Sequence, residues 1–269
     1  MSPAGKAPAL QRCRVQHKRR LAKEVYLLTL QSPEIAHRAE PGNFVNIRVS
    51  DSFVPLWRRP FSIHDARPNA DEFDILFHVV GSGTRLLSRV QVDDELDVLG
   101  PLGNSFPIPD PPAPVLLVAG GLGIAPFLLA ARRLRDAGSR VVLLYGARDR
   151  EHLIDTFPFR EIGVEVHLAT DDGSEGWKGT VAELYRELSP ELPRDALVYT
   201  CGPTASVAAL ARVIESEPAP RRAWASLETL MACGIGACVG CVVETKAGDG
   251  YLLVCKDGPV FQLDEVKLW

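Results

Sequence analysis

The sequence predicts a two-domain α+β chain of 269 residues. Short strand-like runs separated by turns fill residues 10–106, which predicts a small antiparallel β-barrel. From residue 115 onward strand-like and helical runs alternate, which predicts a doubly wound domain of about five parallel strands over residues 115–222. Four of the six cysteines then fall within residues 231–255, so we expect residues 223–269 to form a small additional segment.

Composition excludes several classes of function. Hydrophobic residues make up 46% of the chain, which is enough for well-buried cores, and the formal net charge is −4. The basic run at residues 17–20 is short and adjoins a strand-like run, so we expect a solvated edge and no nucleic-acid site. No apolar run reaches the ~18 residues that a membrane span needs. Residues 1–10 lack the apolar core of a signal peptide, so we expect a cytoplasmic protein without membrane partners.

The barrel is predicted from runs rich in β-forming side chains at residues 14–19, 24–31, 44–49 and 73–80. Residues 41–43 suit a turn before the third run. Residues 83–90 have helical spacing and are expected to plug one end of the barrel, and residues 99–104 are expected to end it with a turn. The proline-rich run at residues 107–114 is expected to be a stiff linker between the domains.

The second domain begins with residues 115–119, which are continuously apolar, as in a parallel strand covered on both faces. Further strands are expected at residues 141–145, 164–169, 197–200 and 222–227. Helices are expected at residues 127–137, at 180–188 and from after residue 203 to about 215. Gly138 is expected to end the first of these helices.

The most specific chemical pattern is the C-x4-C-x2-C…C spacing of Cys233, Cys238, Cys241 and Cys255. This is the plant-type ligand pattern of a [2Fe–2S] cluster. The glycines among the cysteines are expected to adopt positive φ and to bring backbone N–H groups close to the cluster sulfurs; they are Gly234, Gly236 and Gly240. A structural zinc site would pair its cysteines as C-x2-C…C-x2-C, and disulfides would need an oxidising compartment.

Three short motifs suit phosphate groups. The glycine-rich run at residues 120–126 follows the first parallel strand, where open α/β sheets bind nucleotides. Residues 58–62 place arginine beside a hydroxyl on a strand, and residues 81–84 offer free amides at the start of a helix. Each motif has an ordinary alternative, which is respectively a tight strand–helix turn, a surface ion pair and helix capping by Thr84.

Together these motifs resemble a known superfamily. Arg-Pro-Phe-Ser at 59–62, Gly-Ser-Gly-Thr at 81–84, the glycine-rich run at 120–126 and Cys-Gly-Pro at 201–203 resemble the ferredoxin–NADP reductase superfamily. In that superfamily an FAD-binding barrel precedes a nicotinamide-binding α/β domain. Residues 226–241 and 251–261 resemble the electron-transfer subunits of class 1B dihydroorotate dehydrogenases. The resemblance covers roughly residues 10–262.

The resemblance implies three cofactors, which are FAD, a [2Fe–2S] cluster and NAD. It implies that FAD is lined by Arg59, Pro60, Phe61, Ser62, Leu76, Phe77, His78, Gly83 and Thr84. Within this set Arg59 would lie on the pyrophosphate and Ser62 near flavin N5. It implies that NAD is contacted by Gly121, Gly123, Ile124, Asp172, Cys201, Gly202 and Pro203, and that the four C-terminal cysteines bind the cluster. Phe61 lacks the tyrosine hydroxyl common in the superfamily, and Cys201 equally suits a small buried hydrophobic position.

The resemblance also implies a function and a partner. Electrons would pass from an FMN-containing dihydroorotate dehydrogenase catalytic subunit through the cluster and FAD to NAD⁺ in pyrimidine biosynthesis, in a heterotetramer with two copies of each subunit. The chain is too short to contain the second barrel, of about 250 residues, that would oxidise dihydroorotate. No side chain of this chain is expected to act as an acid or base.

Two alternative functions are open. One is an NAD(P)H-dependent reductase subunit that feeds a hydrogenase, an oxygenase or a sulfide-linked enzyme. The other is a non-catalytic metal-binding interaction module. The coenzyme is also open from the residues alone, because Arg148 and Arg150 suit a 2′-phosphate whereas Asp149 and Glu151 repel one; the resemblance favours NAD.

Overall fold

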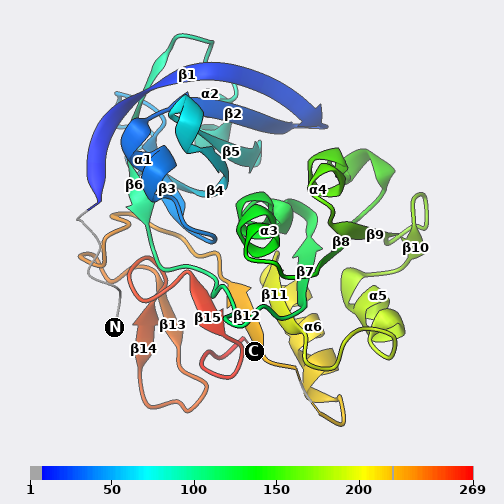
Figure 1. Ribbon diagram of the computed structural model, residues 1–269. Helices are drawn as coiled ribbons and strands as arrows, with labels where there is room; N and C mark the ends of the chain where they lie inside the picture. Colours follow the sequence, from blue (N-terminus) through cyan, green and yellow to red (C-terminus); the bar gives the residue numbers. More distant parts are fainter. Residues whose placement is uncertain (1–7, 220, 269) are drawn as a thin grey trace.

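The computed structural model describes residues 8–219 and 221–268. Its N-terminal part is a closed barrel of antiparallel strands in the order β1-β2-β5-β4-β3-β6 (Figure 1). The strands are β1 (Ala9–Ala22), β2 (Val25–Gln31), β3 (Phe44–Arg48), β4 (Arg59–Arg67), β5 (Glu72–His78) and β6 (Glu95–Leu102). Three short helices decorate the barrel, namely α1 (Pro33–Arg38), η1 (Pro68–Ala70) and α2 (Ser82–Leu87).

The four predicted barrel runs are confirmed as β1, β2, β3 and β5, and the predicted plug helix is α2. Leu87 of α2 is fully buried among the barrel's core side chains. The prediction of a turn at residues 99–104 was wrong, because this region belongs largely to β6. Leu96, Val98 and Leu102 are buried at alternate positions, which is the period of a strand. Strand β6 closes the barrel by pairing with both β1 and β3.

The second domain is a seven-stranded sheet in the order β10-β9-β8-β7-β11-β12-β15. All neighbours pair in parallel except β15, which is antiparallel to β12. The strands are β7 (Val115–Gly120), β8 (Val141–Ala147), β9 (Glu165–Thr170), β10 (Trp177–Lys178), β11 (Leu197–Cys201), β12 (Ala223–Ser226) and β15 (Val260–Gln262). The chain runs outward from β7 to β10 and then returns to β11 on the other side of β7. The strand order therefore reverses between β7 and β11, which is where such sheets bind ligands.

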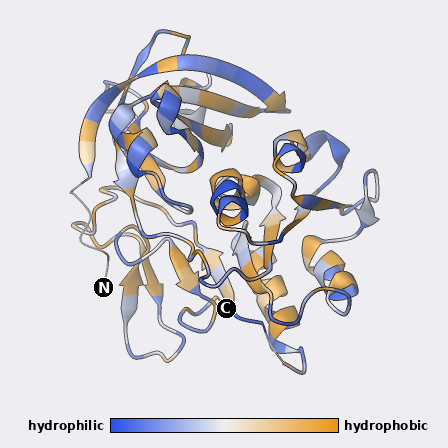
Figure 2. Cartoon of the chain, viewed as in Figure 1, coloured by the Kyte–Doolittle hydropathy of each residue, from blue (hydrophilic) through white to orange (hydrophobic). Residues whose placement is uncertain are grey.

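Helices cover both faces of this sheet. They are η2 (Gly121–Ile124), α3 (Phe127–Asp136), η3 (Arg150–His152), α4 (Phe157–Glu161), α5 (Val181–Leu188) and α6 (Thr204–Glu215). Helices α3 and α4 pack on one face, and α5 and α6 pack on the other. Figure 2 shows α3 and α5 with one hydrophobic and one hydrophilic side, as expected for helices that cover a sheet. Gly138 follows α3 with φ of +87°, so the predicted helix end is confirmed.

The barrel and the sheet domain share buried side chains. Val25 and Leu76 of the barrel lie in the same hydrophobic cluster as Phe127 and Leu128 of α3. Conversely, Leu129 of α3 lies in the hydrophobic cluster of the barrel interior. The two domains are therefore packed against each other through α3.

The C-terminal segment lies below the barrel and beside the sheet (Figure 1). It contains a hairpin of β13 (Val242–Glu244) and β14 (Tyr251–Leu253), followed by β15. Cys241 and Cys255 are buried in a cluster with Phe44 and Leu102 of the barrel. No helix in the described part of the chain is long and apolar enough to span a membrane.

Candidate functional site

A cleft opens where the barrel, the sheet domain and the C-terminal segment meet. Its barrel wall comes from β3, β4, β5 and the start of α2, and its opposite wall contains Leu122 and Ala125 of the glycine-rich loop. A third wall begins at the end of β12 and contains Ser226, Leu227, Glu228, Thr229 and Met231. Sequence reasoning had not assigned this third wall to a site, although residues 226–228 carry part of the resemblance.

The structure brings the predicted FAD-contacting residues together in this cleft. Its lining includes Arg59, Pro60, Phe61, Ser62, Leu76, Phe77, His78 and Thr84. Gly83 lies directly behind the arginine, since a Cβ atom on Gly83 would be 2.9 Å from the Arg59 Nε. A larger residue at this position would therefore displace the guanidinium group that the motif supplies.

Two residues of the phosphate motifs have the ordinary roles considered above, which are an ion pair for Arg58 and helix capping for Thr84. Arg58 forms an ion pair with Asp97 at 2.9 Å and also donates to the Asp97 carbonyl. Thr84 Oγ1 accepts hydrogen bonds from the N–H groups of Val80 and Gly81, at 3.0 and 3.1 Å. Arg59, by contrast, makes its hydrogen bonds to carbonyl groups of its own loop, so its positive charge has no carboxylate partner among them.

The glycine-rich loop and the Cys-Gly-Pro motif meet at the reversal point of the sheet. A Cβ atom on Gly123 would clash with the carbonyl group of Cys201 and would lie 2.6 Å from the Gly202 nitrogen. Gly202 itself has φ of +154°, and a Cβ there would lie 3.0 Å from the Gly120 oxygen. Only glycines allow these two loops to approach so closely. The backbone amides of both loops are thus held at one edge of the sheet, where a pyrophosphate could reach them.

None of the seven predicted NAD-contacting residues belongs to the cleft lining, and three of them have other environments. Ile124 is 1% exposed and packs in the core, and Cys201 is 2% exposed behind Gly123. Burial raises the pKa of the Cys201 thiol, so it stays protonated. Asp172 is exposed in the turn after β9, where its carboxylate accepts hydrogen bonds from the Ser174 N–H and hydroxyl. These hydrogen bonds lower the pKa of Asp172.

The four C-terminal cysteines converge as two pairs of thiols. Cys233 and Cys238 interact near the surface, and Cys241 and Cys255 interact in the interior, where each is 3% exposed. Within the described residues no group of three or more His, Cys, Asp or Glu side chains is arranged to hold a single metal ion. A two-iron cluster instead needs two thiolates on each iron, and the observed pairs match that requirement.

Backbone amides point at these sulfurs. Gly236 N–H donates to Cys255 Sγ at 3.1 Å, and Cys238 N–H donates to Cys233 Sγ at 3.4 Å. Burial opposes ionisation of Cys233, but the N–H groups of Ile235 and Cys238 outweigh it and lower its pKa to about 6. Burial, reinforced by the Cys241 thiol, raises the pKa of Cys255 to about 12. The segment thus already supplies hydrogen bonds of the kind that tune a cluster.

The predicted backbone conformation is only partly confirmed. Gly234 and Gly236 have φ of +74° and +81°, as expected. Gly240 does not have positive φ, so that part of the prediction was wrong; the neighbouring Val239 has φ of +57° instead. The chain turns one residue earlier than the glycine pattern indicates, and Val239 is left with an exposed side chain.

Asn46 connects the barrel to the cysteine segment. Its Nδ2 donates to the Ala232 carbonyl at 3.4 Å, and it is fully buried in β3. Ala232 lies between Met231, which lines the cleft, and Cys233. Sequence reasoning missed this residue; the only available signal was an amide within an otherwise apolar run.

Known protein families match the segments of the chain that form this site. Residues 228–267 match the iron–sulfur cluster binding domain of dihydroorotate dehydrogenase B, and residues 117–212 match the oxidoreductase NAD-binding domain. Over 257 residues the chain is 38% identical to the dihydroorotate dehydrogenase B (NAD(+)) electron transfer subunit of Bacillus velezensis, covering 94% of this chain and 97% of that protein. The chain belongs to this family of electron transfer subunits. The subunit of Shouchella clausii is also 38% identical, over 92% of this chain and 94% of that protein.

Solved structures support the fold of this chain. A structure from work on flavin-based electron bifurcation, the NADH-dependent reduced ferredoxin-NADP oxidoreductase, superposes with a TM-score of 0.86 and 32% identity, over 99% of this chain and 92% of that one. The ferredoxin reductase of carbazole 1,9a-dioxygenase has a TM-score of 0.68 at 22% identity, over 81% of this chain and 68% of that one, and supports the fold alone.

Membership of this family makes the protein an NAD-linked oxidoreductase component whose cofactors are FAD, a [2Fe–2S] cluster and NAD. The residues present fit these groups. Thr229 Oγ1 lines the cleft, is buried and has no hydrogen-bond partner in the described part of the chain, so it is available to a bound ring. The paired thiols and their N–H donors fit a two-iron cluster.

Proposed function

We propose that this subunit carries electrons between a partner's FMN and NAD⁺, through its own cluster and FAD. The observation that supports this most is the short connection Met231-Ala232-Cys233, which joins the wall of the cleft directly to a cluster ligand. The cluster supplies single-electron transfer, and FAD converts single electrons into the hydride that NAD carries. The protein's own residues bind, orient and shield these groups.

We also propose the individual binding roles. Arg59 supplies positive charge for the FAD pyrophosphate, Gly83 leaves room for it, and Ser62 offers a hydroxyl to the ring. For NAD we propose the predicted contacts, which are Gly121, Gly123, Ile124, Asp172, Cys201, Gly202 and Pro203. Three units follow from these roles, which are residues 10–106 for FAD, 115–222 for NAD and 223–269 for the cluster.

The partner is expected to dock over Cys238, the most exposed of the four cysteines. Cys238 is exposed, and the apolar side chains of Leu230, Ile235 and Val239, which are close to it in the sequence, are 93%, 52% and 58% exposed. Apolar exposure of this kind marks interaction surfaces. We propose that an FMN-containing dihydroorotate dehydrogenase catalytic subunit covers it, in a cytoplasmic heterotetramer with two copies of each subunit.

The division of sites is tested by Cys238→Ser. The variant should lose the visible absorbance of the iron–sulfur cluster and its iron while keeping bound FAD. Cys13→Ala is the matched control, because Cys13 is fully buried inside the barrel and its loss should leave both cofactors in place. Loss of both cofactors from Cys238→Ser, or of neither, would contradict the proposal.

The partner is tested by reconstitution with a purified FMN-containing catalytic subunit. Dihydroorotate-dependent reduction of NAD⁺ should appear only with both subunits present. A second candidate is supported by the structural similarity to the NADH-dependent reduced ferredoxin-NADP oxidoreductase. Under it, the subunit would accept electrons from NADH for a different partner, and dihydroorotate would produce no NADH in the reconstituted mixture.

A further inference from the structure

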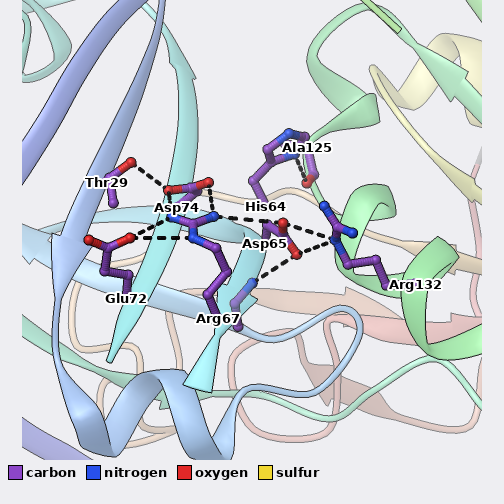
Figure 3. Close-up of polar contacts among 9 residues, drawn as sticks. Thr29, His64, Asp65, Arg67, Glu72, Asp74, Ala125 and Arg132 are labelled. Atoms are coloured by element: carbon purple, nitrogen blue, oxygen red, sulfur yellow. Dashed lines mark hydrogen bonds and ion pairs between the residues drawn. The ribbon is translucent and has the colours of Figure 1, made fainter. Parts of the chain in front are cut away.

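Strand β4 contains an irregularity directly beyond its cleft-lining residues. Ile63 pairs with Ile75 of β5 and Asp65 pairs with Asp74, so His64 is an extra residue without an opposite partner. Successive side chains of a regular strand point to opposite faces. A β-bulge breaks this alternation and redirects a side chain. Figure 3 shows the result, in which His64 points to Ala125, just before α3, and Asp65 points to Arg132 within α3.

His64 contacts the glycine-rich loop. Its Nδ1 lies 2.8 Å from the Ala125 carbonyl oxygen, and the ring is 8% exposed. A carbonyl only accepts hydrogen bonds, so Nδ1 carries the proton and donates. Ala125 directly follows η2 and lines the cleft opposite the FAD-contacting strand. This hydrogen bond therefore joins the barrel to the loop that faces the nucleotide.

Asp65 contacts helix α3 itself, at a residue seven positions after Ala125. Arg132 Nε donates to both oxygens of the Asp65 carboxylate, at 3.1 Å each. The Asp65 side chain is only 3% exposed. Ala125 precedes the first turn of α3, whereas Arg132 lies in the second turn of this helix, which rises about 1.5 Å per residue. Two contacts this far apart fix the direction of α3 as well as its position.

The Asp65 carboxylate is held in place from the barrel side. Arg67 lies 3.7 Å from it and forms two hydrogen bonds with Asp74, at 2.7 and 2.8 Å. Thr29 donates to Asp74, and Glu72 pairs with the other side of Arg67 (Figure 3). Because Asp65 is already oriented, its pairing with Arg132 costs little additional ordering.

We propose that His64 and Asp65 are positioning residues for hydride exchange between FAD and NAD. Ser62 lines the cleft two residues before His64 on the same strand, and Ala125 lines it from the glycine-rich loop. One strand thus sets the separation between the flavin wall and the nucleotide loop. Displacements of about 1 Å can slow a transfer step ~100-fold. This inference rests on the proposed cofactor roles, but it does not depend on which partner the subunit has.

The test uses the holoprotein with FAD and cluster bound, mixed anaerobically with NADH in the absence of any partner. His64→Leu removes the hydrogen bond, whereas His64→Asn keeps an N–H donor near the Nδ1 position. Arg132→Lys keeps the charge but removes the guanidinium geometry. Arg140→Gln is the control, because it breaks an exposed ion pair with Glu165 on the same domain. The readouts are the rate of flavin bleaching, the long-wavelength charge-transfer absorbance, the FAD and iron contents and the urea midpoint.

We expect His64→Leu to slow flavin reduction by about tenfold or more and to weaken the charge-transfer absorbance, with unchanged FAD and iron. His64→Asn should recover most of the rate, Arg132→Lys should slow it, and Arg140→Gln should not change it. A rate within about twofold of wild type for His64→Leu would overturn the proposal. The proposal would also be overturned if His64→Leu and His64→Asn slowed flavin reduction equally. It would be overturned as well if Arg140→Gln slowed flavin reduction as much as His64→Leu.

If His64→Leu does not fold, Arg132→Lys provides the test. An unchanged rate of flavin reduction and an unchanged charge-transfer absorbance in Arg132→Lys would then overturn the proposal. A wild-type flavin that NADH does not reduce would overturn both this inference and the proposed cofactor roles. A failure of dihydroorotate-dependent NAD⁺ reduction with the partner, while NADH still reduces the flavin, would affect the proposed function alone.

Discussion

Gly123 packs against the backbone of Cys201 so closely that a Cβ atom on Gly123 would clash with the Cys201 carbonyl group. Gly123 follows strand β7 and Cys201 ends the neighbouring parallel strand β11, at the point where the strand order reverses. The absence of one side chain therefore determines how closely the two nucleotide-facing loops approach.

Gly123→Ala should displace these loops and so weaken NAD⁺ binding. The same clash should lower the free energy of unfolding by about 1–3 kcal/mol. FAD and iron contents should stay unchanged. Gly121→Ala is the matched variant, since a Cβ there meets nothing within 4 Å, and φ of +53° alone should cost about 1 kcal/mol. Isothermal titration with NAD⁺ checks the contrast; equal affinities for the two variants would contradict it.

Asn46→Ala should loosen the attachment of the cysteine segment to the barrel. The lost hydrogen bond to Ala232 should cost about 1 kcal/mol in the free energy of unfolding. Because Ala232 connects the cleft to Cys233, we also expect slower reduction of the cluster after NADH has reduced the flavin. Stopped-flow absorbance at the flavin and cluster wavelengths separates the two events. A slower flavin step with an unchanged cluster step would contradict this expectation.

His64 should make the stability depend on pH. Burial lowers its pKa, an effect that Arg132 reinforces and that Ala125, Asp74 and Asp65 oppose. The unfolded chain then binds a proton more readily than the folded one, so stability is fully present above the unfolded pKa of about 6.5 and falls as the pH drops below it. The loss should approach about 1.4 kcal/mol per pH unit. Urea unfolding between pH 8 and 5 should show a shallower dependence in His64→Asn, and identical profiles would refute the assignment.

Arg221 should matter for stability alone. Its side chain is 4% exposed, pairs with Glu217 and donates to carbonyl groups of Ser189, Leu192 and Pro193. Arg221→Ala leaves the largely buried Glu217 carboxylate without its cationic partner, which costs about 3–5 kcal/mol and lowers Tm by roughly 6–20 °C. At 20 °C, flavin reduction by NADH should be unchanged. Calorimetry and the stopped-flow assay measure the two effects, and a Tm within a few degrees of wild type would contradict the first.

Local sequence patterns predicted the structural features that depend on residues close together in the chain. The spacing of the cysteines, the apolar runs of β7 and β8 and the cap of α3 were all visible along the chain. Strand β6 was missed because Gly100 and Pro101 indicate a turn, whereas pairing with both β1 and β3 holds them in a strand. The sheet has six parallel strands where about five were expected, because β10 is only two residues long.

Other features depend on contacts that no local pattern contains. The bulge at His64 exists only relative to β5, and the partner of Asn46 is 186 residues away. Glycine content predicted two of the three turns among the cysteines, but Val239 adopts the left-handed conformation that was expected at Gly240. Residue preference alone therefore did not locate that turn.

Strand β15 has a consequence for how this protein can be divided. It follows the last cluster cysteine in sequence, yet it pairs along the free side of β12 and so forms the outer edge of the sheet. Deleting the C-terminal residues would expose the N–H and C=O groups of β12, which invites association with other chains. Removing the cluster-binding segment would thus damage the dinucleotide-binding domain. A truncation between these two parts of the chain should therefore leave neither of them intact.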